Sequence, residues 1–249
     1  MSALARLLLG VYDYLLLYLG LVWLGLLCLS WTLIATVLQL VMPRRPAAML
    51  GRFAIMAGFR IYLATLSASR RCRFDLDALD ALRSEGALII APNHPGLLDA
   101  VMIISRLPNV CCVMKAELMN NVFLGAGARL AGYIRNESVH RMVLQACEDF
   151  KNNSQLLLFP EGTRTTRQPL NPLTGSAGLI ARQAGVPVQT VIIETDTPFL
   201  RKGWPLYRKP DMPMHFRVRL GRRFDPPENT RLFTAELEQY FAEELAQPC

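Results

Sequence analysis

Acidic residues are almost absent from the first 73 residues of this 249-residue chain. That stretch has eight arginines and one carboxylate, Asp13, whereas residues 74–249 hold 19 basic and 19 acidic residues. The net charge of +7 therefore arises entirely in the N-terminal stretch. Nucleic-acid-binding proteins more often carry their excess charge on the folded domain. The placement argues against a nucleic-acid partner and favours an anionic membrane surface.

Histidine and cysteine are also scarce, and their spacing excludes several chemistries. No histidine pairs with a cysteine or another histidine at ligand spacing, so we predict no metal site. No C-x-x-C occurs, and the cysteines are expected to be reduced apolar residues in a cytosolic compartment. A G-x-S-x-G sequence is absent as well, which argues against a lipase. The six cysteines are Cys28, Cys72, Cys111, Cys112, Cys147 and Cys249.

Residues 1–42 form a hydrophobic segment long enough to act as a membrane anchor. From Tyr14 to Met42 the chain has 29 residues without a charge. A helix of that length spans about 43 Å, against a hydrocarbon core of about 30 Å. Two arrangements are compatible with this length, namely one tilted span or a pair of shorter helices that enter one leaflet. No small-residue cleavage site follows a short apolar core, so a removable signal peptide is not expected.

Residues 43–73 are basic and amphipathic. The segment has seven arginines and no acid, and apolar residues fill the space between Arg52 and Arg60. We predict an amphipathic helix that lies on the membrane surface, and the alternative is a helix docked on the folded domain. The arginine excess places this side in the cytoplasm, which for a bacterial protein means the cytoplasmic face of the inner membrane.

Residues 74–249 alternate between strand-like and helix-like segments. Such alternation predicts an α/β domain with a mostly parallel central sheet flanked by helices. We expect strands near 72–76, 87–91, 110–114, 132–135, 155–159, 186–193 and 214–221. We expect helices near 77–84, 121–130, 138–151, 175–184 and 230–246.

A polar segment, residues 93–99, follows the predicted strand at 87–91 and contains His94 and Asp99. Within one helix, five residues rotate the chain by about 140°, so these two side chains would diverge. They can meet only if His94 precedes the helix and Asp99 lies in its first turns. Pro95 and Gly96 supply the necessary break. A carboxylate on one imidazole nitrogen fixes the tautomer and leaves the other nitrogen free as a base.

A second polar segment, Phe159-Pro160-Glu161-Gly162-Thr163-Arg164, follows the apolar run Leu156–Leu158. The carboxyl ends of parallel strands meet at one edge of a sheet, which is where α/β proteins place their sites. We therefore expect the two polar segments to lie together.

The pair of motifs resembles the glycerolipid (lysophospholipid) acyltransferases, typified by the bacterial 1-acyl-sn-glycerol-3-phosphate enzyme, and the resemblance covers about residues 70 to 195. It implies a membrane-bound enzyme that moves a fatty acyl group from acyl-CoA or acyl carrier protein to a lyso-lipid hydroxyl. The implied acceptor is 1-acyl-sn-glycerol-3-phosphate and the implied product phosphatidic acid. The transfer needs no cofactor beyond the thioester co-substrate.

Each motif residue receives an expected role. His94 is the general base and Asp99 orients it, while the backbone N–H near Gly96 is a candidate oxyanion donor. Three cations that end strands, Lys115, Arg135 and Arg164, are candidates to grip a phosphate ester. In the resembled family, arginines at the places of Arg135 and Arg164 bind the acceptor phosphate. The remaining members of the second motif, which shape the acceptor site in that family, are Glu161, Gly162 and Thr163.

Departures from the family pattern leave the acceptor open. Pro95-Gly96 replaces the usual polar pair, Arg135 lacks a preceding aspartate, and Leu173 stands where a lysine is common. The alternatives are a different acceptor (a lyso-amino-acid lipid, a polyene or a glycolipid), a thioesterase using the same base on water, and a non-enzymatic membrane-binding protein.

Overall fold

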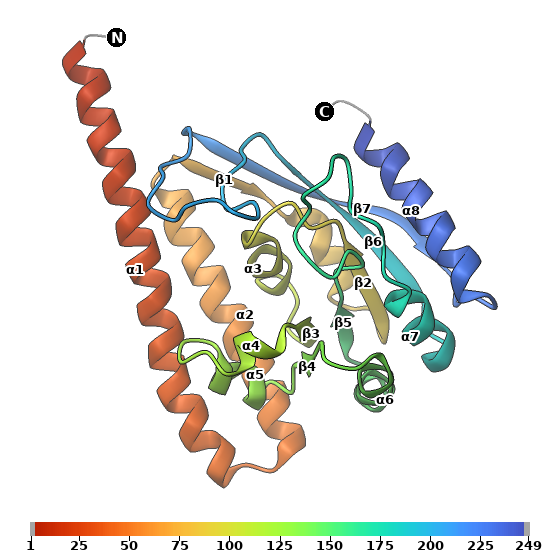
Figure 1. Ribbon diagram of the computed structural model, residues 1–249. Coiled ribbons are helices and arrows are strands. Elements are labelled where there is room, and N and C mark those ends of the chain that lie inside the picture. The colour runs from red at the N-terminus through yellow and green to blue at the C-terminus, as the bar shows by residue number, and fades with distance from the viewer. Residues whose placement is uncertain (1–2, 247–249) are drawn as a thin grey trace.

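Two long helices lie along one side of an α/β domain in the computed structural model, which describes residues 3–246 (Figure 1). Helix α1 runs from Ala3 to Val41 and α2 from Arg44 to Ala68, joined by a short turn. Cys249 and the last residues of the predicted 74–249 domain lie outside the described residues.

The sheet has seven strands in the order β1-β7-β6-β2-β5-β3-β4. Every neighbouring pair is parallel except β6 and β7, which are antiparallel. The prediction of a mostly parallel sheet flanked by helices is confirmed. The strands are β1 Cys72–Asp75, β2 Leu88–Pro92, β3 Val110–Met114, β4 Ile134–Arg135, β5 Gln155–Leu157, β6 Val188–Thr195 and β7 Met214–Phe224.

The helices of the domain cover both faces of this sheet. One core cluster joins the sheet to α1, α2 and α3, and a second joins it to α6, α7 and α8. Strand β2 is buried along its whole length and supplies residues to both clusters, so its C-terminal end is firmly placed. The shorter helices are α3 Leu98–Ile104, α4 Ala116–Met119, α5 Gly125–Leu130, α6 Val139–Phe150, α7 Ser176–Ala184 and α8 Thr230–Ala246, with a 3-10 helix at Asp77–Leu82.

Two predicted helices differ from those observed. Of the segment expected as one helix over 121–130, only Gly125–Leu130 is helical and forms α5, and the separate short helix α4 ends before the segment begins. The side chain of Asn121 accepts the backbone N–H of Phe123 over 2.8 Å, which makes a turn between them. The segment expected as an α-helix over 77–84 is the tighter 3-10 helix.

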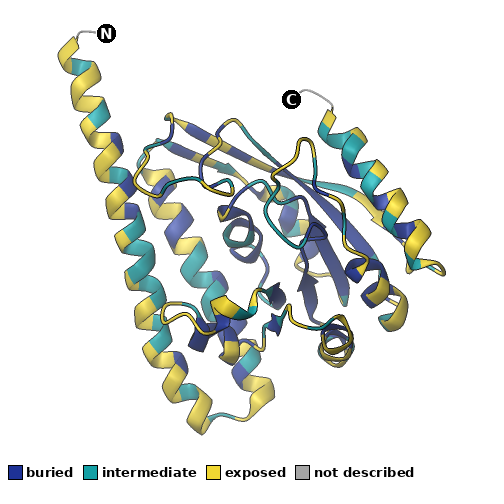
Figure 2. Ribbon diagram, in the orientation of Figure 1, coloured by how far each residue is buried: buried dark blue, intermediate teal, exposed yellow. Residues whose placement is uncertain are grey.

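Helix α1 is one continuous helix of 39 residues, so of the two arrangements considered for residues 1–42 the single long helix forms. Large apolar side chains cover most of its length and are exposed, as Figure 2 shows by its predominantly yellow and teal colouring. Both α1 and α2 are long and apolar enough to cross a membrane. One side of α1 is held to the domain, where Gln39 donates to the Ala126 carbonyl over 2.8 Å.

Helix α2 docks on the domain, which was the less favoured alternative. Arg52 is only 3% exposed and donates to the Ala131 carbonyl over 2.9 Å and to the Asp149 carboxylate over 2.7 Å. The prediction that Arg52 lies on a membrane surface is therefore wrong, because acceptors on the domain satisfy its guanidinium. The opposite side of α2 still exposes Met49, Leu50, Phe53 and Ile61.

Candidate active site

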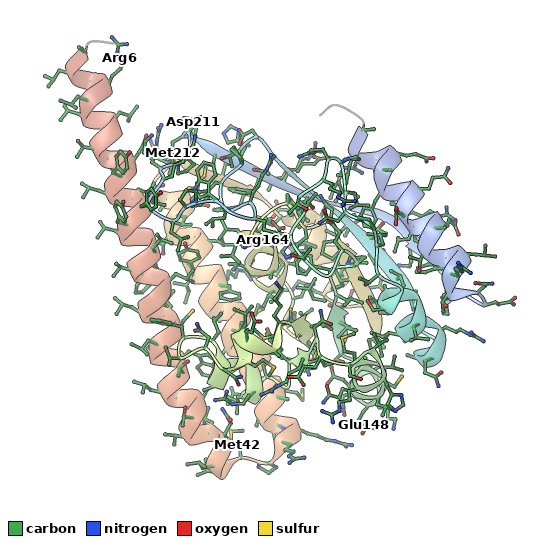
Figure 3. All side chains as sticks on the ribbon, viewed as in Figure 1. Arg6, Met42, Glu148, Arg164, Asp211 and Met212 are labelled. Carbon is green, nitrogen blue, oxygen red and sulfur yellow. The ribbon has the colours of Figure 1, made fainter. Side chains whose placement is uncertain are left out.

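The two predicted polar segments and the predicted cations Lys115 and Arg135 lie at the C-terminal ends of four neighbouring parallel strands, in the order β2, β5, β3 and β4. His94 follows β2, the second motif follows β5, Lys115 follows β3, and Arg135 ends β4. The sheet therefore gathers all the predicted segments along one edge, as expected for an α/β protein. Arg164, from the second motif, is labelled in Figure 3.

His94 and Asp99 meet as predicted. The imidazole Nδ1 lies 2.8 Å from Asp99 Oδ2. Helix α3 begins at Leu98, so His94 precedes the helix and Asp99 is its second residue. The Asp99 side chain is 2% exposed, and burial raises the pKa of its carboxyl above the ordinary range, while the hydrogen bond from His94 opposes that shift. Within residues 3–246, no group bonds to the other ring nitrogen, Nε2, which is available as a base.

Phe159 fixes the plane of the imidazole. The His94 and Phe159 rings are stacked, with centroids 3.8 Å apart and planes 22° from parallel. Asp99 holds one edge of the imidazole and Phe159 covers one face, so the direction of Nε2 is set by two contacts. The His94 side chain remains 16% exposed, which leaves an approach for a substrate.

Glu161 joins the two motifs rather than pointing at an open site. Its buried carboxylate accepts the backbone N–H of His94 over 3.0 Å, the Thr165 hydroxyl over 2.8 Å and the Asn171 N–H over 2.9 Å. The Thr165 N–H in turn donates to the His94 carbonyl over 2.8 Å. Both backbone polar groups of His94 are thus held by the second motif and the residue that follows it.

Two asparagines, Asn93 and Asn171, hold the backbone of the motifs in place through hydrogen bonds. The sequence analysis gave neither of them a role. The Asn93 side chain pairs with both backbone groups of Ile193, over 3.0 and 2.7 Å, and so continues the pairing of β2 with β6 past the end of the strand. Asn171 accepts backbone N–H groups of Thr166 and Arg167, each over 3.1 Å, and donates to the Arg164 carbonyl over 3.1 Å. The position of Asn93 directly before His94 was the only signal in the sequence.

Arg164 keeps a positive charge free of acidic partners. Its Nη1 donates to the carbonyls of Leu200, over 2.9 Å, and Arg201, over 3.3 Å. Among the described residues, no carboxylate lies within 4.0 Å of its guanidinium. Two carbonyls orient this cation without neutralising it, which suits a group that receives an anion.

Lys115 and Arg135 come from adjacent strands, β3 and β4, at the far end of the row. Met114, next to Lys115, is opposite Arg135 in the pairing of β3 with β4. Lys115 is exposed and has no ion pair within residues 3–246, whereas Arg135 lies 3.3 Å from the Glu137 carboxylate. Strand β4 is three positions from β2, roughly 14 Å at the usual strand spacing. These two cations therefore mark the end of the site furthest from His94.

The two motif glycines have different structural roles. The Gly96 N–H donates to Asp99 Oδ2 over 2.8 Å, which argues against its expected use as an oxyanion donor, because the group is already engaged. Gly162 has φ of +67°, a left-handed conformation that favours glycine. Thr163, which follows it, is partly buried. Within residues 3–246, no three histidine, cysteine or acidic side chains are grouped to hold a metal ion.

Known proteins share both the sequence pattern and the fold. Residues 73–194 match the model of the family described as Acyltransferase. A candidate 1-acyl-sn-glycerol-3-phosphate acyltransferase of Caenorhabditis elegans is 30% identical over 125 residues, which cover 47% of this chain and 44% of that protein. The chain thus matches less than half the length of that relative.

The fold as a whole is like that of a solved enzyme. The crystal structure of the 1-acyl-sn-glycerophosphate (LPA) acyltransferase PlsC from Thermotoga maritima superposes with a TM-score of 0.67, over 98% of this chain and 99% of that one, at 17% identity. That likeness concerns the fold alone. The family match places an Acyltransferase domain at residues 73–194, the segment that carries His94 and Asp99.

Proposed function

We propose that this chain is a membrane-bound O-acyltransferase that moves a fatty acyl group from a thioester to the free hydroxyl of a lyso-lipid. The preferred acceptor is 1-acyl-sn-glycerol-3-phosphate, which would give phosphatidic acid. The observation that carries the proposal is the His94–Asp99 pair, with Nδ1 engaged over 2.8 Å and Nε2 open. The names of the two relatives support the choice of acceptor.

The chemistry follows from that pair. Nε2 of His94 takes the proton of the acceptor hydroxyl while the oxygen attacks the thioester carbonyl. A C–O bond forms, the tetrahedral intermediate collapses, and the C–S bond breaks. The departing thiolate recovers a proton from the imidazolium, whose charge Asp99 stabilises. Transfer in this way is direct and leaves no acyl group on the protein.

The cations along the sheet edge supply a site for the acceptor phosphate. Arg164 is oriented by carbonyls alone, and Lys115 is exposed without an ion pair among residues 3–246. Arginine suits a phosphate because its planar fork donates two parallel hydrogen bonds. Binding the phosphate there would leave the glycerol hydroxyl to reach His94.

Membrane attachment would bring the enzyme to its substrates. The exposed apolar surface of α1 and the outer side of α2 fit contact with lipid, and the surrounding arginines fit the cytoplasmic leaflet. The donor, acyl-CoA or acyl carrier protein, would then be drawn from the cytoplasm and the lyso-lipid from the bilayer.

The test is acyl transfer by the full chain in mixed micelles. Lysophosphatidic acid and an acyl thioester should yield phosphatidic acid, and release of free fatty acid should be much slower when the acceptor is omitted. Equal thioester cleavage with and without acceptor would identify a thioesterase instead. Mass spectrometry of lipids from cells lacking the protein should show the accumulated lyso-lipid.

One contact in the structure favours an acceptor without a phosphate at Arg135. Glu137 lies 3.3 Å from Arg135 and competes with a phosphate for that guanidinium. Arg135→Ala separates the two cases. A large rise in KM for lysophosphatidic acid supports the phosphate acceptor, whereas an unchanged KM supports an acceptor without a phosphate at this position.

A further inference from the structure

The loop between β6 and β7, residues 196–213, touches the candidate site at one end and helix α1 at the other. In Figure 1 this loop extends from the sheet toward α1, and Figure 3 labels Asp211 and Met212 beside that helix. The proposed chemistry uses none of its side chains. We name it the connecting loop.

At its first end the connecting loop holds both motifs. The Leu200 carbonyl accepts Arg164 Nη1 over 2.9 Å and the Leu97 N–H over 3.2 Å, and the Arg201 carbonyl lies 3.3 Å from the same Nη1. Leu200 is buried with φ of +60°, a left-handed conformation that is uncommon for leucine. Unfavourable backbone conformations of this kind concentrate at functional sites. Here the left-handed residue is Leu200, whose carbonyl accepts hydrogen bonds from two residues of the motifs, Leu97 and Arg164.

At its other end the connecting loop is fixed to α1 by side chains of that helix. Lys209 Nζ lies 3.5 Å from the Asp13 carboxylate and 5.9 Å from the centre of the Tyr14 ring. The Tyr18 hydroxyl donates to the Tyr207 carbonyl over 3.3 Å. Asp13, the one carboxylate in the first 73 residues, is thus used to bind this loop.

Arg71 completes the attachment. It donates twice to Asp13, over 2.7 and 2.9 Å, and once to the Met212 carbonyl over 3.2 Å. Asp13 is 3% exposed, so the contact lies out of water, where charge-assisted hydrogen bonds are strongest. Because Arg71 alone satisfies Asp13 twice, removal of Lys209 leaves the carboxylate paired.

The interior of the connecting loop is hydrogen-bonded between these two ends. The Trp204 N–H donates to the Arg201 carbonyl over 3.0 Å, and its indole N–H donates to the Arg208 carbonyl over 3.1 Å. The Arg208 guanidinium lies 4.9 Å from the Trp204 ring centre, and the ring meets Phe199 edge to face. Trp204 therefore ties the carbonyls near Arg164 to the residues that contact α1.

We propose that Lys209 and Tyr18 are positioning residues for the acceptor phosphate. They fix the connecting loop on α1, and the loop's carbonyls at Leu200 and Arg201 hold the guanidinium of Arg164. The membrane helix and the phosphate-binding arginine are in this way joined by one segment. The inference rests on the proposed function, in which Arg164 receives the acceptor phosphate.

The first test compares two lysines of the same loop in the full chain in mixed micelles. Lys209→Met should raise KM for lysophosphatidic acid about three- to tenfold, a size typical of coupled pairs, with KM for the thioester unchanged. Lys202→Met is the matched control, because Lys202 is exposed and has no ion pair within residues 3–246, and it should leave both constants unchanged. Tyr18→Phe should shift KM in the same direction as Lys209→Met.

The second test is a double-mutant cycle. If Lys209 acts through Arg164, Lys209→Met should raise KM for lysophosphatidic acid in the unchanged protein but not in Arg164→Ala. An equal rise in both backgrounds, or a rise shared by the thioester, would overturn the inference and leave only a structural role. So would an unchanged KM in Lys209→Met. Failure of the unchanged protein to acylate lysophosphatidic acid would instead contradict the proposed function itself.

Discussion

The backbone N–H of His94 donates to the carboxylate of Glu161 over 3.0 Å, across a separation of 67 residues in the chain. This bond makes the second motif part of the support of the proposed base. The Glu161 carboxylate therefore binds the main chain of the segment that carries His94, and its hydrogen bonds are all made within the protein.

Replacing Glu161 with glutamine tests that support. Glutamine has one acceptor oxygen where the carboxylate has two, so one buried donor loses its partner at a cost of about 1–3 kcal/mol. We expect the melting temperature to fall and kcat to fall roughly ten- to hundredfold, because small displacements of a catalytic group are costly. Thr165→Val, which removes only one bond to Glu161, should be milder. A normal kcat in Glu161→Gln would show that this support is dispensable.

Asp99 should contribute to activity at the expense of stability. Burial raises the pKa of its carboxyl, so the folded chain keeps that proton to a higher pH than the unfolded chain does. Between the unfolded and folded pKa values the contribution of Asp99 to stability therefore declines as the pH rises. Above the folded value the ionised carboxylate is a net cost.

Asp99→Asn separates these two effects. Both hydrogen bonds to this side chain end on Oδ2, so an amide oxygen in the same place can keep them. We expect denaturant titrations to find the variant at least as stable as the unchanged protein at neutral pH, with the advantage shrinking in acid. Without the charge that stabilises the imidazolium, kcat should fall by about a hundred- to ten-thousandfold. Loss of stability at neutral pH with full activity would contradict this assignment.

Arg52 provides a test of how α2 is attached. Arg52→Met leaves Asp149 without its cationic partner in a poorly hydrated place, and loss of one member of a buried pair typically costs about 3–5 kcal/mol. Arg45, on the same helix, reaches Glu148 only at 3.8 Å on the open surface. Arg45→Met should therefore leave the unfolding midpoint unchanged. Equal, small effects of the two changes would mean that α2 is not docked through Arg52.

The sequence was sufficient to predict the central pair, because a break before the helix allows residues five apart to meet and because the two motifs together resemble those of a known acyltransferase family. Pro95 and Gly96 marked the break before α3, and the apolar runs marked β2 and β5. The α/β fold followed from the same alternation. Local sequence pattern was thus enough to predict contacts between residues that are close together in the chain.

Long-range contacts could not be predicted in the same way. Arg52 looked like one member of a basic amphipathic surface, yet its acceptors lie 79 and 97 residues away, at Ala131 and Asp149. Asp13 looked like an isolated charge in an apolar helix, yet it pairs with Arg71. In both cases the partner is chosen by the packing of elements distant in sequence, on which hydrophobic periodicity carries no information.

The most direct measurement of the central claim is acyl transfer by His94→Ala, assayed as phosphatidic acid formed from lysophosphatidic acid and an acyl thioester. Sedimentation with lipid vesicles should match the unchanged protein, because His94 is not part of the membrane surface. Thermal unfolding should stay cooperative at a somewhat lower midpoint, because the buried Asp99 loses its partner. We predict that transfer falls to the background rate while folding and membrane binding persist. A variant that folds, binds membranes and keeps most of its transfer activity would contradict the assignment of His94 as the base.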